Sequence, residues 1–392
     1  MIMRILGSLM LAVLCTVSTM AFAQGKGGAI DFTSSIGRET TCQRYATLEL
    51  KRLARNEDKA AWAICAMVDT VRDTATWAHR MQIAQNPTAQ ESVQRIRDRL
   101  ELILDRVDEI RGPLEAIRNS KPLFVVRPGD WVIDWDGDGK VTPFERHLLW
   151  VPRREVASFA DRERFSSPEG YYERQFHSPV VKVDQADIHW LLAYLHFGQA
   201  TINLLLSYDI EVSGDFRIVL RNPERVRTRA YRHLLEGVRQ SRALRAALAK
   251  ETDDDDEWIP NPKQLRTSFP LKMDAQTFDT WGLLLGHMDK LLRGQTLLGG
   301  TVESREFAVR DLTAGVCKPG EGINVRELFL NPLPELWGRN RGIAERCVKP
   351  TAAIPFSGLA AMVADSVRRN SGSAQGDFSG EAMILRHFYW VN

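Results

Sequence analysis

The chain has almost no excess charge of either sign, because its 392 residues include 52 Lys and Arg against 50 Asp and Glu. A balanced chain has no long-range field that would draw it to nucleic acid or to an anionic membrane surface. Motifs of common enzymes are missing as well: the sequence has no Gly-x-Ser-x-Gly, no His-Glu-x-x-His and no phosphate-binding loop. Internal repeats of about 20–50 residues do not emerge either. Nucleic-acid binding and solenoid folds are therefore not expected.

Cysteine is scarce, with five residues in the chain, and the first of them lies in a segment that we expect to be removed. Residues 1–23 have the pattern of a secretory signal peptide: Arg4 supplies the positive start, residues 5–17 the apolar segment and residues 21–23 a small-x-small cleavage site. A membrane anchor is the alternative, but the apolar segment is short for one. We therefore predict a periplasmic or secreted protein.

Four cysteines remain in the mature chain: Cys42, Cys65, Cys317 and Cys347. An even number of cysteines in an oxidising compartment favours disulfides. Local pairing closes the shortest loops, so we predict one bridge between Cys42 and Cys65 and another between Cys317 and Cys347. A zinc site is the competing interpretation, but none of the four has a CxxC neighbour or a nearby His at ligand spacing.

The strongest chemical signal is the acidic segment 134–145, DWDGDGKVTPFE. It places carboxylates at positions one, three, five and twelve and a glycine at position six, a spacing that suits a calcium ion with about seven oxygen ligands. The segment resembles the calcium-binding loop of EF-hand proteins. This resemblance implies the ligands Asp134, Asp136, Asp138, Lys140 (through its carbonyl), Thr142 and Glu145. It covers only these twelve positions, so it implies a site and no whole-chain family, and an acidic turn without metal is the alternative.

The flanks of this loop depart from the EF-hand pattern. Residues 127–133 are too few and too rich in turn formers for an entering helix, so an extended entry is expected, whereas Pro143 suits the first turn of an exit helix. Thr142 and Glu145 also match a capping box, and Glu145 cannot give both oxygens to calcium and still reach back to the Thr142 amide. We expect the ion to take precedence. Because four close carboxylates repel one another without it, calcium should be structural and should order the loop.

Apolar residues recur at helical spacing through most of the remaining chain, often behind a capping residue. We expect helices over residues 41–54, from Asn56, from Thr88 with a bend or an end at Gly112-Pro113, from Asp184, from Asn222 and from Asp274. The predicted fold class is mainly α, a multi-helix globular protein with one EF-hand-like calcium loop entered from an extended segment. We expect residues 24–392 to form either one helical domain or two lobes (24–120 and 184–392) that are joined by the calcium-loop region 121–183.

Residues 190–208 contain no Asp, Glu, Lys or Arg, so a membrane span has to be weighed. Polar residues such as His196, Gln199 and Asn203 are costly to bury in lipid, and apolar residues lie on both helical faces. We therefore interpret the segment as a buried central helix and expect no membrane span in the mature chain. Further along, the basic segment 221–250 is followed by the acidic run 251–257, which we interpret as a solvated loop that neutralises the helix.

Together these features predict a periplasmic or secreted calcium-binding helical protein with a non-enzymatic binding or scaffold role towards an envelope protein or ligand. The alternative is an envelope hydrolase whose dispersed site lies near Asp187, His189 and His196. For the two histidines, a place in the core with satisfied hydrogen bonds is the preferred interpretation.

Overall fold

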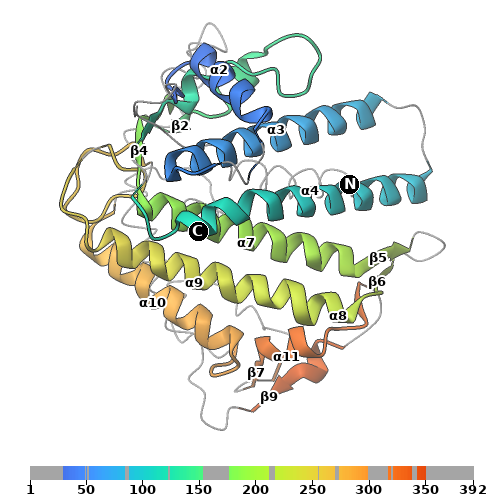
Figure 1. Ribbon diagram of the computed structural model, residues 1–392. Helices are drawn as coiled ribbons and strands as arrows, with labels where there is room; N and C mark the ends of the chain where they lie inside the picture. The colour runs from blue at the N-terminus through green and yellow to red at the C-terminus, as the bar shows by residue number, and fades with distance from the viewer. Residues whose placement is uncertain are drawn as a thin grey trace, which may run out of the picture. The chain divides into compact units, whose positions relative to one another are not determined.

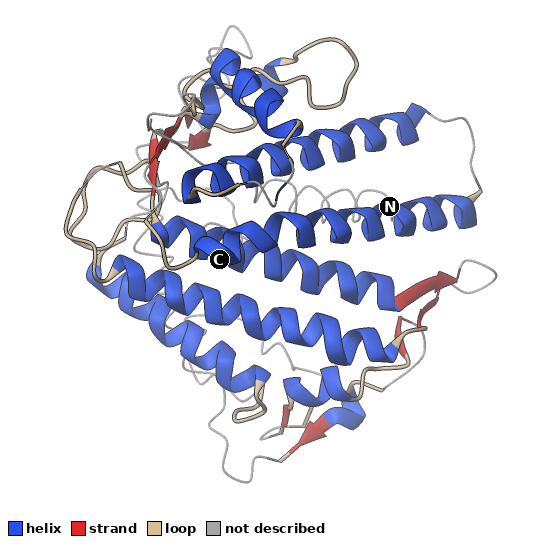
Figure 2. Ribbon diagram, viewed as in Figure 1, coloured by secondary structure: helices blue, strands red, loops and turns tan. Residues whose placement is uncertain are grey.

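The computed structural model describes residues 30–48, 50, 53–83, 88–121, 124–152, 176–211, 217–254, 256–269, 273–298, 317–318, 321–337 and 342–349. Long helices dominate these residues and the strands among them are short, as Figure 2 shows. The predicted mainly α fold is therefore confirmed. The predicted signal peptide, residues 1–23, lies outside the described residues.

The chain divides into two compact units, each discontinuous in sequence. Unit 1 consists of Met1–Asn86, Asp105–Leu192 and Ala243–Asp274, and unit 2 of Pro87–Leu104, Ala193–Arg242 and Ala275–Asn392. The loop 134–145 belongs to unit 1. The two lobes expected from the sequence, with boundaries at residues 120 and 184, stay a prediction.

Two helices of unit 1, α2 (Ser35–Ala46) and α3 (Asn56–Ile83), lie side by side (Figure 1). The Cys42–Cys65 disulfide joins them. Helix α2 begins earlier than predicted because the Ser34 side chain accepts a hydrogen bond from the Gly37 amide and so caps the first turn. Helix α3 begins at Asn56, where the sequence predicts a helix start.

Helix α4 (Ala89–Ile117) carries the apolar seam that the sequence predicts, with Ile110, Leu114 and Ile117 buried. The helix does not end at Pro113 but continues for one more turn. Pro113 is itself buried beside Leu114, and this packing offsets the loss of one main-chain hydrogen bond at the proline.

Short antiparallel strands frame the loop 134–145 in unit 1: β1 (Phe124–Val126) pairs with β4 (Val181–Val183), and β2 (Val151–Pro152) pairs with β3 (Phe176–His177). Phe32 adds a parallel bridge to Val126. The side chains of Phe124 and Val126 are fully buried, so β1 is anchored in the core before the chain enters the loop.

Helix α7 (Gln185–Ser207) contains most of the uncharged segment that the sequence predicts to be a buried helix, and nearly all of its side chains are at least half-buried. Leu191, Leu192 and Ala193 are almost inaccessible to solvent. Among the helices within the described residues, none combines the length and the apolar character that crossing a bilayer requires.

Unit 2 combines a small sheet with packed helices. Its antiparallel sheet has the order β5 (Tyr208–Glu211), β6 (Arg217–Leu220) and β8 (Glu335–Trp337). Its helical segments are α8 (Pro223–Arg225), a π-helical turn (Val226–Ala230), α9 (Tyr231–Leu248), which ends in unit 1, α10 (Ala275–Leu292) and α11 (Val325–Leu330). A two-stranded pair, β7 (Gly322–Ile323) with β9 (Cys347–Val348), completes it.

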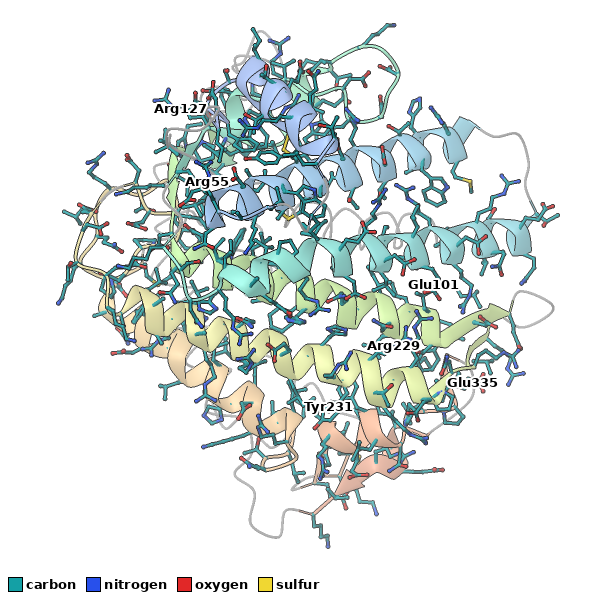
Figure 3. All side chains as sticks on the ribbon, in the orientation of Figure 1. Arg55, Glu101, Arg127, Arg229, Tyr231 and Glu335 are labelled. Carbon is teal, nitrogen blue, oxygen red and sulfur yellow. A yellow bond between two sulfur atoms is a disulfide. The ribbon has the colours of Figure 1, made fainter. Side chains whose placement is uncertain are left out.

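Tyr231, labelled in Figure 3, ties three of these segments together. Its hydroxyl donates to the Leu292 carbonyl at 2.6 Å, at the end of α10, and its ring stacks on Phe329 of α11 at a centroid distance of 5.4 Å. The Cys317–Cys347 disulfide lies in the same unit. Both predicted local cysteine pairings are therefore confirmed.

Asp58→Asn is expected to lower the free energy of unfolding by about 1–3 kcal/mol. The Asp58 carboxylate accepts a hydrogen bond from the Tyr45 hydroxyl at 2.6 Å and two from Arg55, at 2.8 and 2.9 Å; Arg55 is labelled in Figure 3. Hydrogen bonds from Arg55 hold the pKa of Asp58 below its ordinary value. The contribution is therefore present above the unfolded pKa of about 4 and is lost as the pH falls through the lower folded value.

Urea denaturation at pH 7 and at pH 3 tests this expectation, with Glu57→Gln in the same helical turn as the control. The loss in Asp58→Asn should be smaller at pH 3 than at pH 7. A wild-type midpoint for Asp58→Asn at pH 7 would contradict it.

Candidate metal centre

The loop 134–145 is entered from an extended segment, as the sequence predicts. After the 3₁₀ turn Pro128–Asp130, the side chains of Trp131, Ile133 and Trp135 are buried, while Val132 between them is exposed. This alternation is that of an extended chain lying on a core. The Trp131 indole nitrogen donates to the Phe32 carbonyl at 2.7 Å, so the start of the loop is anchored by both packing and a buried hydrogen bond.

The acidic side chains fold the loop around themselves. The two carboxylate oxygens of Asp134 accept hydrogen bonds from the amides of Gly137 and Gly139, at 2.8 and 2.9 Å. Both glycines have positive φ, +73° and +87°, a conformation that other residues rarely adopt. Asp136 accepts from the Asp138 amide at 3.1 Å. The chain therefore turns tightly about the first carboxylate.

Glu145 closes the loop from its far end and is only 6% exposed. Its Oε1 accepts from the amides of Trp135 and Asp136 at 2.9 and 3.3 Å, and its Oε2 accepts from the amide and the hydroxyl of Thr142, both at 2.9 Å. The capping box expected for the exit helix α5 (Pro143–Arg146) is thus formed. The same carboxylate holds both the start and the end of the loop.

Three carboxylates converge within the loop. Asp134, Asp136 and Glu145 each offer one oxygen, and these oxygens all lie within 4.8 Å of one another. Oxygens on opposite sides of a calcium ion are about 4.6–5.2 Å apart, because each lies 2.3–2.6 Å from the ion. One such ion can therefore contact all three, and a donor set made only of oxygen suits a hard cation.

The other predicted ligands, Asp138, Lys140 and Thr142, lie on the exposed side of the loop. The Asp138 carboxylate accepts a hydrogen bond from the Lys140 amide at 2.8 Å. This hydrogen bond stabilises the turn from Asp138 to Lys140, whose carbonyl is one of the predicted ligands. Thr142 is engaged with Glu145 in the capping box. The structure thus brings together the oxygens of three of the six predicted residues, and the other three residues are exposed in the same loop.

Helix α3 contacts the loop. The Thr76 hydroxyl donates to the Trp135 carbonyl at 3.3 Å, and His79 Nδ1 lies 3.3 Å from an oxygen of Asp136. A side chain at Gly137 would meet Thr76, since an added Cβ would lie 3.0 Å from its hydroxyl oxygen. The sequence did not reveal this contact, because α3 lies more than fifty residues upstream and carries no local signal for it.

The residues of the alternative hydrolase site are all buried on α7 but have different neighbours. Asp187 accepts a hydrogen bond from the Asp184 amide at 3.1 Å, whereas His196 Nδ1 lies 2.9 Å from His233 Nδ1. The described cleft of about 250 Å³ beside the Cys42–Cys65 disulfide is lined by none of Asp187, His189 and His196.

The structure contains a second group of carboxylates that no pattern in the sequence predicts. Asp184, Glu251 and Glu257 also offer oxygens that lie within 4.8 Å of one another. The last two bracket the acidic run that was interpreted as a solvated loop, and Glu257 is in fact buried. The acidic composition of this run predicts exposure to solvent. The signal for burial is the apolar pair Trp258-Ile259, which follows directly.

Comparison with protein-family models, with curated proteins and with solved structures gives no match to this chain. The functional inference therefore rests on the geometry of its own residues.

Proposed function

We propose that this chain is an extracytoplasmic calcium-binding protein with a binding or scaffold role, in which one calcium ion at the loop 134–145 is structural. The observation that carries the proposal is the convergence of the oxygens of Asp134, Asp136 and Glu145 within 4.8 Å. The Lys140 carbonyl, Asp138 and Thr142 complete the ligand set, as the resemblance to an EF-hand loop implies.

A structural role follows from where the loop is attached. Its start is anchored to the core through Trp131 and Trp135, its end caps α5, and its flank contacts α3. Neutralising the clustered carboxylates would stabilise the loop and with it the contacts to the core and to α3. Calcium bound mostly by protein oxygens also leaves little room for a substrate and is a weak activator of water.

The proposed location rests on the cysteines. Two disulfides, Cys42–Cys65 and Cys317–Cys347, are typical of an oxidising, extracytoplasmic compartment. The predicted signal peptide points the same way, and periplasmic or secreted is the location we propose. Extracellular calcium modules have dissociation constants of about 10⁻⁴–10⁻³ M, which suits a compartment where calcium is not kept low.

Calcium titration of wild type and Asp134→Asn tests the loop assignment. Asp134→Asn is expected to weaken calcium binding by about tenfold or more, because it removes a negative charge and one of the two oxygens that accept the loop hydrogen bonds. Calcium at ten times the dissociation constant should stabilise wild type by about 1.4 kcal/mol, measured by thermal denaturation. Terbium at the loop should be sensitised by Trp131 and Trp135.

Asp130→Asn is the matched control, because this exposed carboxylate lies four positions before the loop. It should bind calcium as wild type does. Equal affinity and equal thermal stabilisation in Asp134→Asn and wild type would place the calcium site elsewhere or remove it.

A further inference from the structure

A second cluster of acids lies in unit 1, between the start of α7 and the loop that follows α9. Asp184 caps α7, with Oδ1 accepting from the Ala186 amide at 2.7 Å, and Asp187 follows within the first turn. Glu251 and Glu257 come from the loop after α9. One oxygen each from Asp184, Glu251 and Glu257 lies within 4.8 Å of the other two.

The loop that presents these acids is held by buried side-chain amides. Asn261 donates to the carbonyls of Leu248 and Glu251, at 3.0 and 3.2 Å, and Gln264 donates to the carbonyl of Asp253 at 3.0 Å. The residue after Glu257, Trp258, packs edge-on against Trp190 of α7 and Phe269. The positions of the carboxylates are therefore built into the fold.

Glu257 is buried, Asp184 and Glu251 are half-buried, and none of the three has a cationic partner in the described part of the chain. Glu257 is 4% exposed, and the one hydrogen-bonding neighbour of its carboxyl is another acid, Asp253. Glu251 Oε1 is buried with no hydrogen-bond partner among the described residues. We expect the negative charge of such oxygens to be balanced by a bound cation or proton, since an unpaired buried charge is costly.

The carboxylates of Asp184, Glu251 and Glu257 lie close enough to repel one another when they are ionised. A cation bound among them would offset this repulsion.

We propose that Asp184, Glu251 and Glu257 form a second site for a hard divalent cation. The donors are all oxygens, as calcium and magnesium prefer and as zinc or copper do not. Their mutual distances fit the diameter of a calcium coordination shell. The ion would tie the start of α7 to the loop after α9, and this site is independent of the loop 134–145.

Counting bound calcium ions by equilibrium dialysis tests the proposal. Wild type should bind two ions, Asp134→Asn one, the double variant Glu251→Gln/Glu257→Gln one, and the combination of all three substitutions none. Asp130→Asn should keep two. The Gln side chains have nearly the size of the acids and match their protonated form, so the double variant should fold; near-ultraviolet circular dichroism checks this, and Glu251→Gln alone serves if it does not.

The same stoichiometry for the double variant and wild type would overturn the proposal and leave protons as the compensation. The proposal would also be overturned if wild type bound one ion and this ion were lost in Asp134→Asn but kept in the double variant. One ion lost only in the double variant would support this site and remove the loop site. Dialysis against magnesium as the second probe shows whether the site accepts the smaller ion. One more bound ion in chains with intact Glu251 and Glu257 than in the double variant, with either metal, supports the proposal.

Discussion

Glu145→Ala is expected to abolish calcium binding at the loop 134–145 in the millimolar range and to destabilise the protein even when calcium is removed. The side chain is buried, and its two oxygens accept four hydrogen bonds from Trp135, Asp136 and Thr142. Removing it leaves the buried Trp135 amide and three partly buried donors without an acceptor, and a buried donor left unsatisfied costs about 1–3 kcal/mol. We therefore expect a loss of about 3 kcal/mol or more in the free energy of unfolding.

Urea denaturation in a chelator measures the metal-independent part of this loss, and the same experiment in excess calcium adds the binding part. Phe144→Ala is the matched control, because the neighbouring side chain is 52% exposed and should change stability by less than about 0.5 kcal/mol. If Glu145→Ala unfolds in chelator at the same urea concentration as Phe144→Ala, Glu145 does not hold the loop.

Trp258→Ala is expected to lower the free energy of unfolding by about 3–5 kcal/mol, the range for removing a large aromatic side chain from a core. Trp258 is 1% exposed and packs against Trp190 at 6.0 Å and Phe269 at 5.5 Å between ring centroids. The cavity left behind would loosen the loop after α9 where it meets α7.

Chemical denaturation followed by far-ultraviolet circular dichroism measures the effect. Leu265→Ala is a control from the same loop, because this side chain is 81% exposed and its loss should be within about 0.5 kcal/mol. Trp258→Phe should lie between the two, since it keeps a ring in the site. A loss below 1 kcal/mol for Trp258→Ala would contradict the core role of this residue.

Local signals in the sequence predicted the parts of the structure that depend on neighbouring residues. The start of α3 at Asn56, the extended entry to the loop and the pairing of Cys42 with Cys65 all follow from short-range patterns. The capping box of Thr142 and Glu145 is of the same kind. Such features are set by main-chain geometry over a few residues, or by the short loop that a bridge closes.

Contacts between residues far apart in the chain could not be predicted from the sequence. Nothing near Thr76 or His79 indicates that α3 packs on the loop, because helical spacing says which face is apolar and not what covers it. Glu251 and Glu257 were interpreted by their charge as solvated, whereas Glu257 is carried inward by the adjacent Trp258. Packing of the tryptophan outweighed the preference of a carboxylate for water, since an indole buries a large apolar area.

The contact between α3 and the loop bears on the order of folding. In an EF-hand the ion's loop and both helices are contiguous, so local chain closure can assemble the site. Here Thr76 and Trp135 are 59 positions apart, and closing so long a loop carries an entropic cost that the chain must meet before the contact can form. The loop can make its contact with α3 only after this helix has docked. An ion bound at the proposed site would therefore stabilise a unit that is already assembled, and it would not nucleate the folding of that unit.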